Sequence, residues 1–157
     1  MMTTEALTTT RRTQPSDYLY LTSMILIVLG LLVSGYLSYV QLNDTAMVCI
    51  DNGAFNCDRV QSSAYSKFLG IEVAYLGFLT YAVMGGLLLL EKRIGLLQEY
   101  GPLLMFGISL FAFLFSMWLV YAQVVLLQAL CQWCLMHEVI ITILFAISSI
   151  RLWRSLR

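Results

Sequence analysis

Residues 130–138 read Leu-Cys-Gln-Trp-Cys-Leu-Met-His-Glu, and this stretch decides how the rest of the chain is interpreted. It places a Cys-x-x-Cys pair, Cys131 and Cys134, where a long apolar run begins, with two ionisable residues about one turn deeper. The chain has only two other cysteines, Cys49 and Cys57. In so hydrophobic a chain, such a pair indicates redox chemistry rather than packing.

The composition predicts an integral membrane protein. Of the 157 residues, 60% are hydrophobic and only 11% are charged, whereas a soluble domain of this length needs more polar surface. At about 20 residues per span, the apolar runs predict an all-α bundle of four transmembrane helices. The predicted spans are residues 18–40, 71–90, 102–125 and 131–150. The formal net charge is zero and no basic patch occurs, so nothing indicates a nucleic-acid partner.

The predicted membrane domain, residues 18–150, lies between two polar tails. Residues 1–17 are rich in Thr and predict a disordered tail, and residues 151–157 form a short basic tail. The first apolar run is too long for a signal peptide and lacks its cleavage site, so it is interpreted as a span. Pro102 is expected in the first turn of the third span. Small residues at helical spacing in the first span predict a close helix neighbour: Gly30, Ser34, Gly35 and Ser38.

The loop of residues 41–70 is the only sizeable polar segment between spans. Asn56 or Asp58 is expected to cap a short helix there, and Gly70 to end it. That helix would be amphipathic and lie on the membrane surface, because one face carries Val60, Ala64 and Phe68. An ordinary solvated loop helix is the alternative.

The basic residues predict the topology. Seven of the nine Lys and Arg lie in the tails and in the turn between spans two and three: Arg11, Arg12, Lys92, Arg93, Arg151, Arg154 and Arg157. The positive-inside rule then places both termini in the cytoplasm of a multi-pass cell-membrane protein. With four spans, all four cysteines fall on the extracytoplasmic, oxidising side.

The two cysteine pairs differ in their expected chemistry. Cys131 opens a helix, where backbone N–H groups stabilise a thiolate, and Cys134 lies one turn deeper. Their spacing closes a small, reducible disulfide suited to exchange. Cys49 and Cys57 are close enough in sequence to bridge within one loop. Three readings remain open: a static loop disulfide, a four-thiolate zinc site, or a relay between the pairs through mixed disulfides.

A relay ending at Cys134 needs an electron acceptor within the bilayer. The sequence contains no haem, flavin or iron–sulfur motif, so a lipid-soluble quinone is the expected acceptor. Cys131, Cys134 and Glu138 share a helical face, and ionisable groups at membrane depth are costly and usually functional. We expect His137 or Glu138 to hydrogen-bond the quinone or pass a proton. Snorkelling, or pairing with another helix, is the alternative, and Glu72 is expected to be an interfacial residue.

Several motifs together resemble the vitamin K epoxide reductase family over about residues 18–150. They are the cysteines Cys49 and Cys57, the run Cys57-Asp58-Arg59-Val60-Gln61-Ser62-Ser63, the segment Gly70-Ile71-Glu72-Val73-Ala74-Tyr75-Leu76-Gly77, and Cys131-Gln132-Trp133-Cys134. The resemblance implies a four-helix bundle around a quinone of the ubiquinone, menaquinone or vitamin K type, capped by a loop helix.

The resemblance also implies roles for individual residues. Cys134 would be the sulfur nearest the quinone, Cys131 would exchange with Cys57, and Cys49 would engage the redox partner. Ser63 matches the functional Ser or Thr of the family. Val73, which stands where animal enzymes carry a quinone-binding Asn, and Gly77 are expected beside the quinone. The quinone roles expected of His137 and Glu138 rest instead on the helical geometry described above. Bacterial relatives are often fused to a thioredoxin-like domain, and because this chain ends soon after the fourth span, its partner is expected to be a separate thioredoxin-fold protein.

The predicted function is therefore a quinone-dependent thiol–disulfide oxidoreductase that oxidises an extracytoplasmic partner. One alternative is a vitamin K quinone or epoxide reductase working in the reducing direction at the expense of partner thiols. The other is a non-enzymatic membrane protein whose cysteines are structural or bind a metal.

Overall fold

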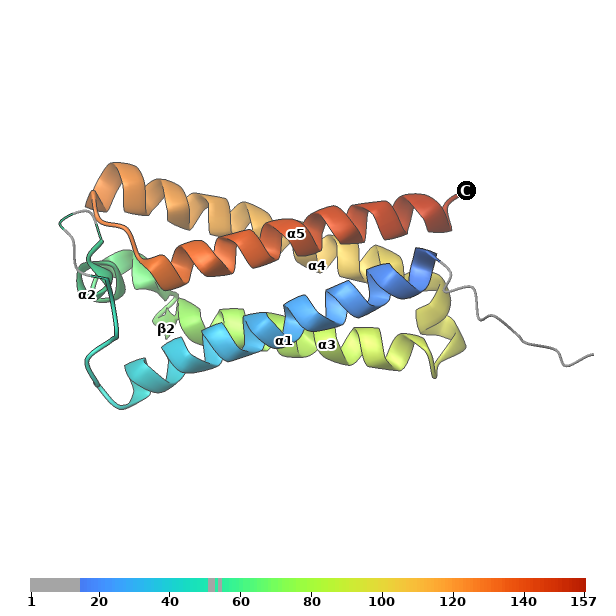
Figure 1. Cartoon of the computed structure of the whole chain (residues 1–157), viewed down its shortest axis with the longest axis horizontal. Helices are drawn as coiled ribbons and strands as arrows, with labels where there is room; N and C mark the ends of the chain where they lie inside the picture. Colours follow the sequence, from blue (N-terminus) through green and yellow to red (C-terminus); the bar gives the residue numbers. More distant parts are fainter. Residues whose placement is uncertain (1–14, 51–52, 54) are drawn as a thin grey trace, which may run out of the picture.

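Four long helices form one bundle in the computed structural model, which describes residues 15–50, 53 and 55–157 (Figure 1). They are α1 (Pro15–Leu42), α3 (Val73–Glu91), α4 (Gly95–Tyr121) and α5 (Gln132–Ser155). Each is long and apolar enough to cross a membrane, with α4 extended to Leu127 by a π-helical segment. The predicted all-α four-span architecture is confirmed, and the chain is a multi-pass membrane protein.

The helices pack α1 against α3 and α5, and α4 against α3 and α5. Fully buried side chains of all four helices form the core, including Ile27, Tyr81, Met105 and Ile141. The small residues of α1 permit the predicted close approach, because a Cβ atom on Gly30 would overlap the Tyr81 ring of α3.

Short elements cover one end of the bundle. They are α2 (Cys57–Gln61), the 3-10 helix η1 (Ala64–Ser66), and the strands β1 (Lys67–Phe68) and β2 (Ile71–Glu72). The strands pair antiparallel across a turn in which Leu69 and Gly70 both have positive φ angles, as a tight primed hairpin turn requires. We call this region, with residues 43–72 and 122–131, the cysteine end. The start of α1, the end of α5 and the α3–α4 turn lie at the opposite, basic end (Figure 1).

The local predictions for the loop helix and for Pro102 are wrong. The loop helix ends at Gln61 rather than near Gly70, so Val60, Ala64 and Phe68 do not share one helix. The α3–α4 turn is short and α4 already begins at Gly95, which places Pro102 inside that helix rather than in its first turn. In the helix interior the missing N–H of a proline leaves the carbonyl four residues earlier without its usual donor.

At the N-terminus, α1 begins at Pro15, so residues 15–17 belong to the helix rather than to the predicted tail. Proline is favoured at a first helical position because its φ is already suitable. The rest of that predicted tail, residues 1–14, lies outside the described part of the chain.

Candidate active site

Cys49 and Cys57 form a disulfide with a Cα–Cα distance of 6.3 Å. Cys57 is the first residue of α2 and is buried, with 1% of its surface exposed. The side chain of Asn56 caps α2 by accepting a 2.9 Å hydrogen bond from the Arg59 backbone N–H, as predicted for Asn56. The cap and the disulfide fix the start of α2, so that Cys57 has a defined position.

Cys131 is fully buried and directly precedes α5, as its position in the sequence predicts. Its backbone N–H donates to the side-chain oxygen of Gln123 at 3.1 Å. Gln123 is itself buried and lies on the π-helical segment η2 (Ala122–Leu127). That segment ends at Gln128, whose left-handed backbone conformation turns the chain back toward α5.

Backbone pairing holds the two cysteine regions in register. On one side of the disulfide, the Asn56 N–H donates to the Leu130 carbonyl at 3.0 Å, and Phe55 forms a parallel bridge with Leu130. The residues just before Cys57 and just before Cys131 are therefore hydrogen-bonded neighbours. Such pairing fixes the distance between two chain segments more firmly than side-chain packing alone.

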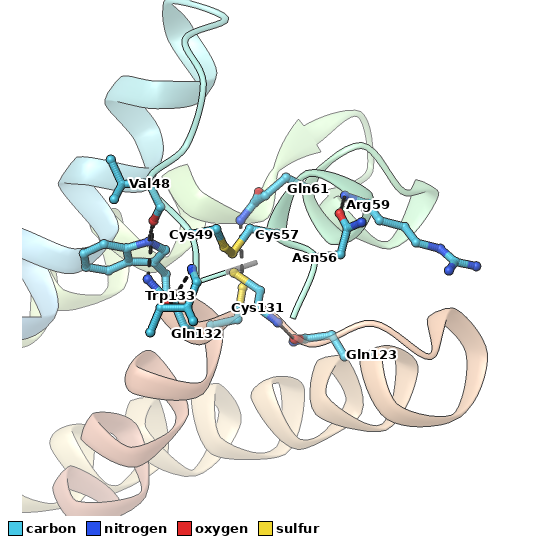
Figure 2. The surroundings of a disulfide bond; sticks show 12 residues. Val48, Cys49, Asn56, Cys57, Arg59, Gln61, Gln123, Cys131, Gln132 and Trp133 are labelled. Carbon is cyan, nitrogen blue, oxygen red and sulfur yellow. Dashed lines mark hydrogen bonds between the residues drawn. A yellow bond between two sulfur atoms is a disulfide. The ribbon is translucent and has the colours of Figure 1, made fainter. Parts of the chain in front are cut away.

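On the other side of the disulfide, the two residues inside the Cys-x-x-Cys motif hold the backbone around Cys49. Gln132 accepts from the Ile50 N–H at 3.2 Å and donates to the Val48 carbonyl at 3.3 Å. The Trp133 indole N–H donates to the same Val48 carbonyl at 2.9 Å. The segment carrying Cys49 is thus attached to the start of α5 (Figure 2).

These hydrogen bonds bring all four sulfurs into one group. Cys57 and Cys131 belong to one buried cluster with Val60 and Ala129, and both Cys49 and Cys134 pack against it. Figure 2 shows Cys131 beside the Cys49–Cys57 disulfide, while Arg59 of the same loop points away. A thiol beside a disulfide is the arrangement that thiol–disulfide exchange requires.

The local field favours the thiolate of Cys131. A hydrogen bond from the Cys134 thiol has the largest effect on the pKa of Cys131 and lowers it, whereas burial raises it. The backbone N–H groups of Cys134 and Trp133 and the side chain of Gln61 lower it further. The resulting pKa of Cys131 is about 7. Cys131 and Cys134 are both free thiols in this structure. Cys131 is therefore the more nucleophilic sulfur at neutral pH.

A largely apolar cavity of about 370 Å³ opens beside Cys134. Its walls come from α1, α3, α4, α5 and the loop elements, and Cys134 and His137 reach it from α5. Three further residues named from the sequence also line it: Ser63, Val73 and Gly77. A pocket of this size, mostly apolar with a few polar groups, is typical of sites for small apolar molecules, and the residues present fit a quinone ring.

Glu138 shares a helical face with Cys134 but is not among the residues that line the cavity. Its carboxylate instead accepts a hydrogen bond from Ser116 of α4 and a 3.3 Å bond from Thr142. Pairing with another helix, the alternative considered for this residue, is what the structure has. Of the two ionisable residues after Cys134, only His137 faces the cavity.

Ser63 directly precedes η1, and its hydroxyl donates to the Val60 carbonyl at 2.6 Å. Its side chain thereby helps to close the turn after α2 while lining the cavity. The zinc alternative requires four thiolates, whereas two of the four sulfurs are joined here as a disulfide.

The sequence did not single out three glutamines at this site. Gln123 holds Cys131, Gln132 holds the Cys49 segment, and Gln61 lies 3.8 Å from the Cys134 sulfur through its side-chain nitrogen. A signal existed for Gln61, since it follows Cys57 by one helical turn and so shares its face. For Gln123 no local pattern was available, because its contact depends on the π-helical turn.

The chain matches the model of a known protein family. The model described as "Vitamin K epoxide reductase family" matches residues 21–149, which includes all four cysteines and all four long helices over most of their lengths.

Proposed function

The chain belongs to the vitamin K epoxide reductase family, whose members perform membrane redox chemistry with cysteines, and from this premise we propose that it is a quinone-dependent thiol–disulfide oxidoreductase. It oxidises a separate extracytoplasmic thioredoxin-fold protein and passes the electrons to a membrane quinone. The observation that carries the proposal is the buried cluster that Cys57 shares with Cys131, with Cys49 packed against it and Cys134 lining the cavity.

The first half of the reaction exchanges disulfides. A partner thiolate attacks the Cys49 sulfur, the Cys49–Cys57 bond breaks, and Cys57 leaves as a thiolate. The second partner thiol then attacks the mixed disulfide, which releases the oxidised partner and the Cys49 thiol. Two electrons now reside on Cys49 and Cys57, and no other oxidant has been used.

The second half moves these electrons inward. Cys57 attacks a Cys131–Cys134 disulfide at Cys131, Cys134 leaves as a thiolate, and Cys49 resolves the Cys57–Cys131 bond by attacking Cys57. The products are a Cys49–Cys57 disulfide and two thiols at Cys131 and Cys134, the same pairing that this structure has.

Electron transfer to the acceptor then re-forms the Cys131–Cys134 disulfide. Closing the Cys131–Cys134 disulfide releases two electrons and two protons, which a quinone held in the cavity would accept. His137 would hydrogen-bond a ligand oxygen, since it lines the same cavity as Cys134, and Val73 and Gly77 would form the wall. Ser63 keeps the loop closed over the cavity through Val60.

We propose that the cysteine end faces the extracytoplasmic side. The start of α1, the end of α5 and the turn with Lys92 and Arg93 lie at the other end of the bundle (Figure 1), where the positive-inside rule expects cytoplasm. An oxidising compartment is also where a loop disulfide persists.

Complementation of a host that lacks its own disulfide-forming oxidase tests the proposal. The wild-type protein should restore disulfide formation, and each of the four single Cys→Ala variants should fail at equal membrane abundance. In a Cys57→Ala variant, the Cys49 thiolate should attack the disulfide of the oxidised partner and release one partner thiolate, which leaves a mixed disulfide that Cys57 can no longer resolve. Full complementation by Cys134→Ala would mean that the cysteines are only structural.

One alternative acceptor is favoured by the family itself, namely a vitamin K epoxide. Both reactions draw electrons from thiols through the same cysteines and differ only in the molecule that occupies the cavity. Purified protein supplied with dithiothreitol and either quinone or epoxide distinguishes them, since the proposed oxidase consumes quinone and leaves the epoxide unchanged.

A further inference from the structure

A chain of polar side chains links the surface of the cysteine end to the redox sulfurs. Gln41, near the end of α1, donates through one nitrogen to Glu72 at 2.7 Å and to the Gln61 side-chain oxygen at 3.0 Å. The Gln61 nitrogen in turn lies 3.8 Å from the Cys134 sulfur, and the Gln61 side chain also contributes to the lowered pKa of Cys131. Figure 2 shows Gln61 directed toward the sulfur cluster.

The carboxylate fixes the direction of this chain. An ionised Glu72 only accepts hydrogen bonds, so the amide of Gln41 must present its NH₂ group to it. The second hydrogen of that NH₂ group then meets the oxygen of Gln61. The opposite orientation would turn the Gln41 oxygen toward two other oxygens. In this orientation the Gln41 side-chain oxygen is buried and has no hydrogen-bond partner among the described residues.

The orientation of Gln61 follows from that of Gln41. Because the Gln61 oxygen is occupied by the Gln41 donor, its NH₂ group is the part that faces the sulfurs. Hydrogen bonds in series polarise one another, so the carboxylate also strengthens the final N–H donor. A hydrogen bond to an ionised acceptor is stronger than one to a neutral acceptor, which favours the thiolate over the disulfide sulfur.

We propose that Gln61 is a catalytic residue of the Cys131–Cys134 couple, and that Gln41 and Glu72 are positioning residues which aim its N–H donor at the two sulfurs. The donor stabilises the reduced pair and thereby makes the pair more oxidising, as stabilisation of a reduced dithiol does in general. This inference rests on the proposed redox role of Cys131 and Cys134. Its test uses glutathione alone, so it does not depend on the protein partner or the quinone.

The test measures an equilibrium. Full-length protein in nanodiscs is equilibrated with glutathione buffers, in which the Cys131–Cys134 disulfide and two glutathione thiols exchange with two protein thiols and one glutathione disulfide. Differential alkylation and peptide mass spectrometry give the reduced fraction. For Gln61→Leu we expect the equilibrium constant for reduction to fall about tenfold, equivalent to a potential lower by about 30 mV. Glu72→Gln should shift it in the same direction by about threefold, because an uncharged amide no longer fixes the orientation of Gln41.

Two further variants separate the donor from a space-filling role. Gln61→Glu has nearly the same shape but no N–H donor, and should lower the potential at least as much as Gln61→Leu. Lys67→Met is the matched control, since Lys67 pairs with Glu72 at 3.4 Å but is 59% exposed, and it should leave the potential unchanged. A wild-type potential in Gln61→Glu or in Gln61→Leu would overturn the proposal. A shift in Gln61→Leu without one in Glu72→Gln would overturn the roles of Glu72 and Gln41. If Gln61→Leu does not fold, Gln61→Glu and Glu72→Gln decide.

Discussion

The two ends of the bundle are joined by different kinds of interaction. At the basic end, Nη2 of Arg151 in α5 donates to both carboxylate oxygens of Glu91 in α3 at 2.7 and 2.8 Å, and the two side chains are only 13% and 15% exposed. At the cysteine end, within the described residues, amide and backbone hydrogen bonds connect α1, the loop and α5 around the disulfide.

The difference corresponds to what each end has to do. A buried ion pair holds two helices at one distance and tolerates little change, because separating the charges in a low dielectric is costly. Hydrogen bonds between segments that flank the cysteines can persist while sulfur–sulfur bonds are exchanged among them. The basic end is thus suited to stability and the cysteine end to changing covalent connections, a contrast that the following predictions test.

The largest expected effect at the cysteine end comes from Cys134→Ala. Without this sulfur the Cys131–Cys134 disulfide cannot form, so acceptor reduction should be lost completely. Cys131 should still attack Cys57 and accumulate a Cys57–Cys131 bond, because it lies in the same buried cluster. Peptide mapping under non-reducing conditions measures this bond. Acceptor reduction at the wild-type rate would contradict the relay.

His137→Leu should slow acceptor reduction by about 100-fold, the lower end of the usual contribution of a positioned proton donor. Disulfide exchange between the two cysteine pairs should not change, since His137 lines the cavity and is not part of the sulfur cluster. Glu138→Gln is the matched control, because Glu138 faces Ser116 instead. Equal losses of acceptor reduction in His137→Leu and Glu138→Gln would show that the effect does not depend on whether the residue lines the cavity.

At the basic end, Glu91→Gln should lower the free energy of unfolding by about 3 kcal/mol, near the low end for breaking a buried ion pair, because it leaves Arg151 without its counter-charge. Reversible unfolding in detergent measures this change, and the activity per folded molecule should stay the same. Exposed Arg154→Gln serves as control, with a change of about 0.5 kcal/mol or less. A Glu91→Gln variant of normal stability but altered redox activity would contradict the division between the ends.

The sequence predicted the local features of the molecule but not the contacts between distant segments. The four spans, Cys131 at the start of α5 and the Asn56 cap were predictable, because apolar runs and capping residues are local signals. The network of Gln41, Gln61 and Glu72 was not, because it joins segments 20 and 31 residues apart.

For His137 and Glu138, the sequence predicted their positions on α5 but not which side chains they contact. Relative to Cys134, helical geometry turns His137 and Glu138 to opposite sides of nearly the same face. Which of the two meets the cavity depends on where α4 presents Ser116, and this is a matter of tertiary packing. The roles of these residues and of Ser63, Val73 and Gly77 stay predictions.

Gln132→Ala should slow the attack of Cys131 on the loop disulfide by about tenfold, because it removes both of its hydrogen bonds to the segment that carries Cys49. Trp133→Phe keeps the ring beside Tyr36 and removes only the bond to Val48, so about threefold is expected. The rate is measured as maleimide labelling of Cys49, which becomes a free thiol only when the disulfide opens. Cys131→Ser gives the background, and unchanged labelling in Gln132→Ala would show that its hydrogen bonds do not position Cys49.

The smallest expected effect is a weak pH dependence of this same labelling rate above neutrality. The attacking species is the thiolate, whose fraction rises with pH, and with the pKa of Cys131 at about 7 half of it is already present at pH 7. The rate, corrected for the reactivity of the maleimide, should therefore rise only about twofold between pH 7 and pH 9, whereas a cysteine with the ordinary pKa of about 8.5 would give about 25-fold. The Cys134 thiol is the main cause of the lowered pKa, so Cys134→Ala should restore the steeper profile. A steep profile in the wild-type protein would mean that the hydrogen bonds around Cys131 do not prepare it for attack, and the cysteine end would then differ from the basic end in structure but not in reactivity.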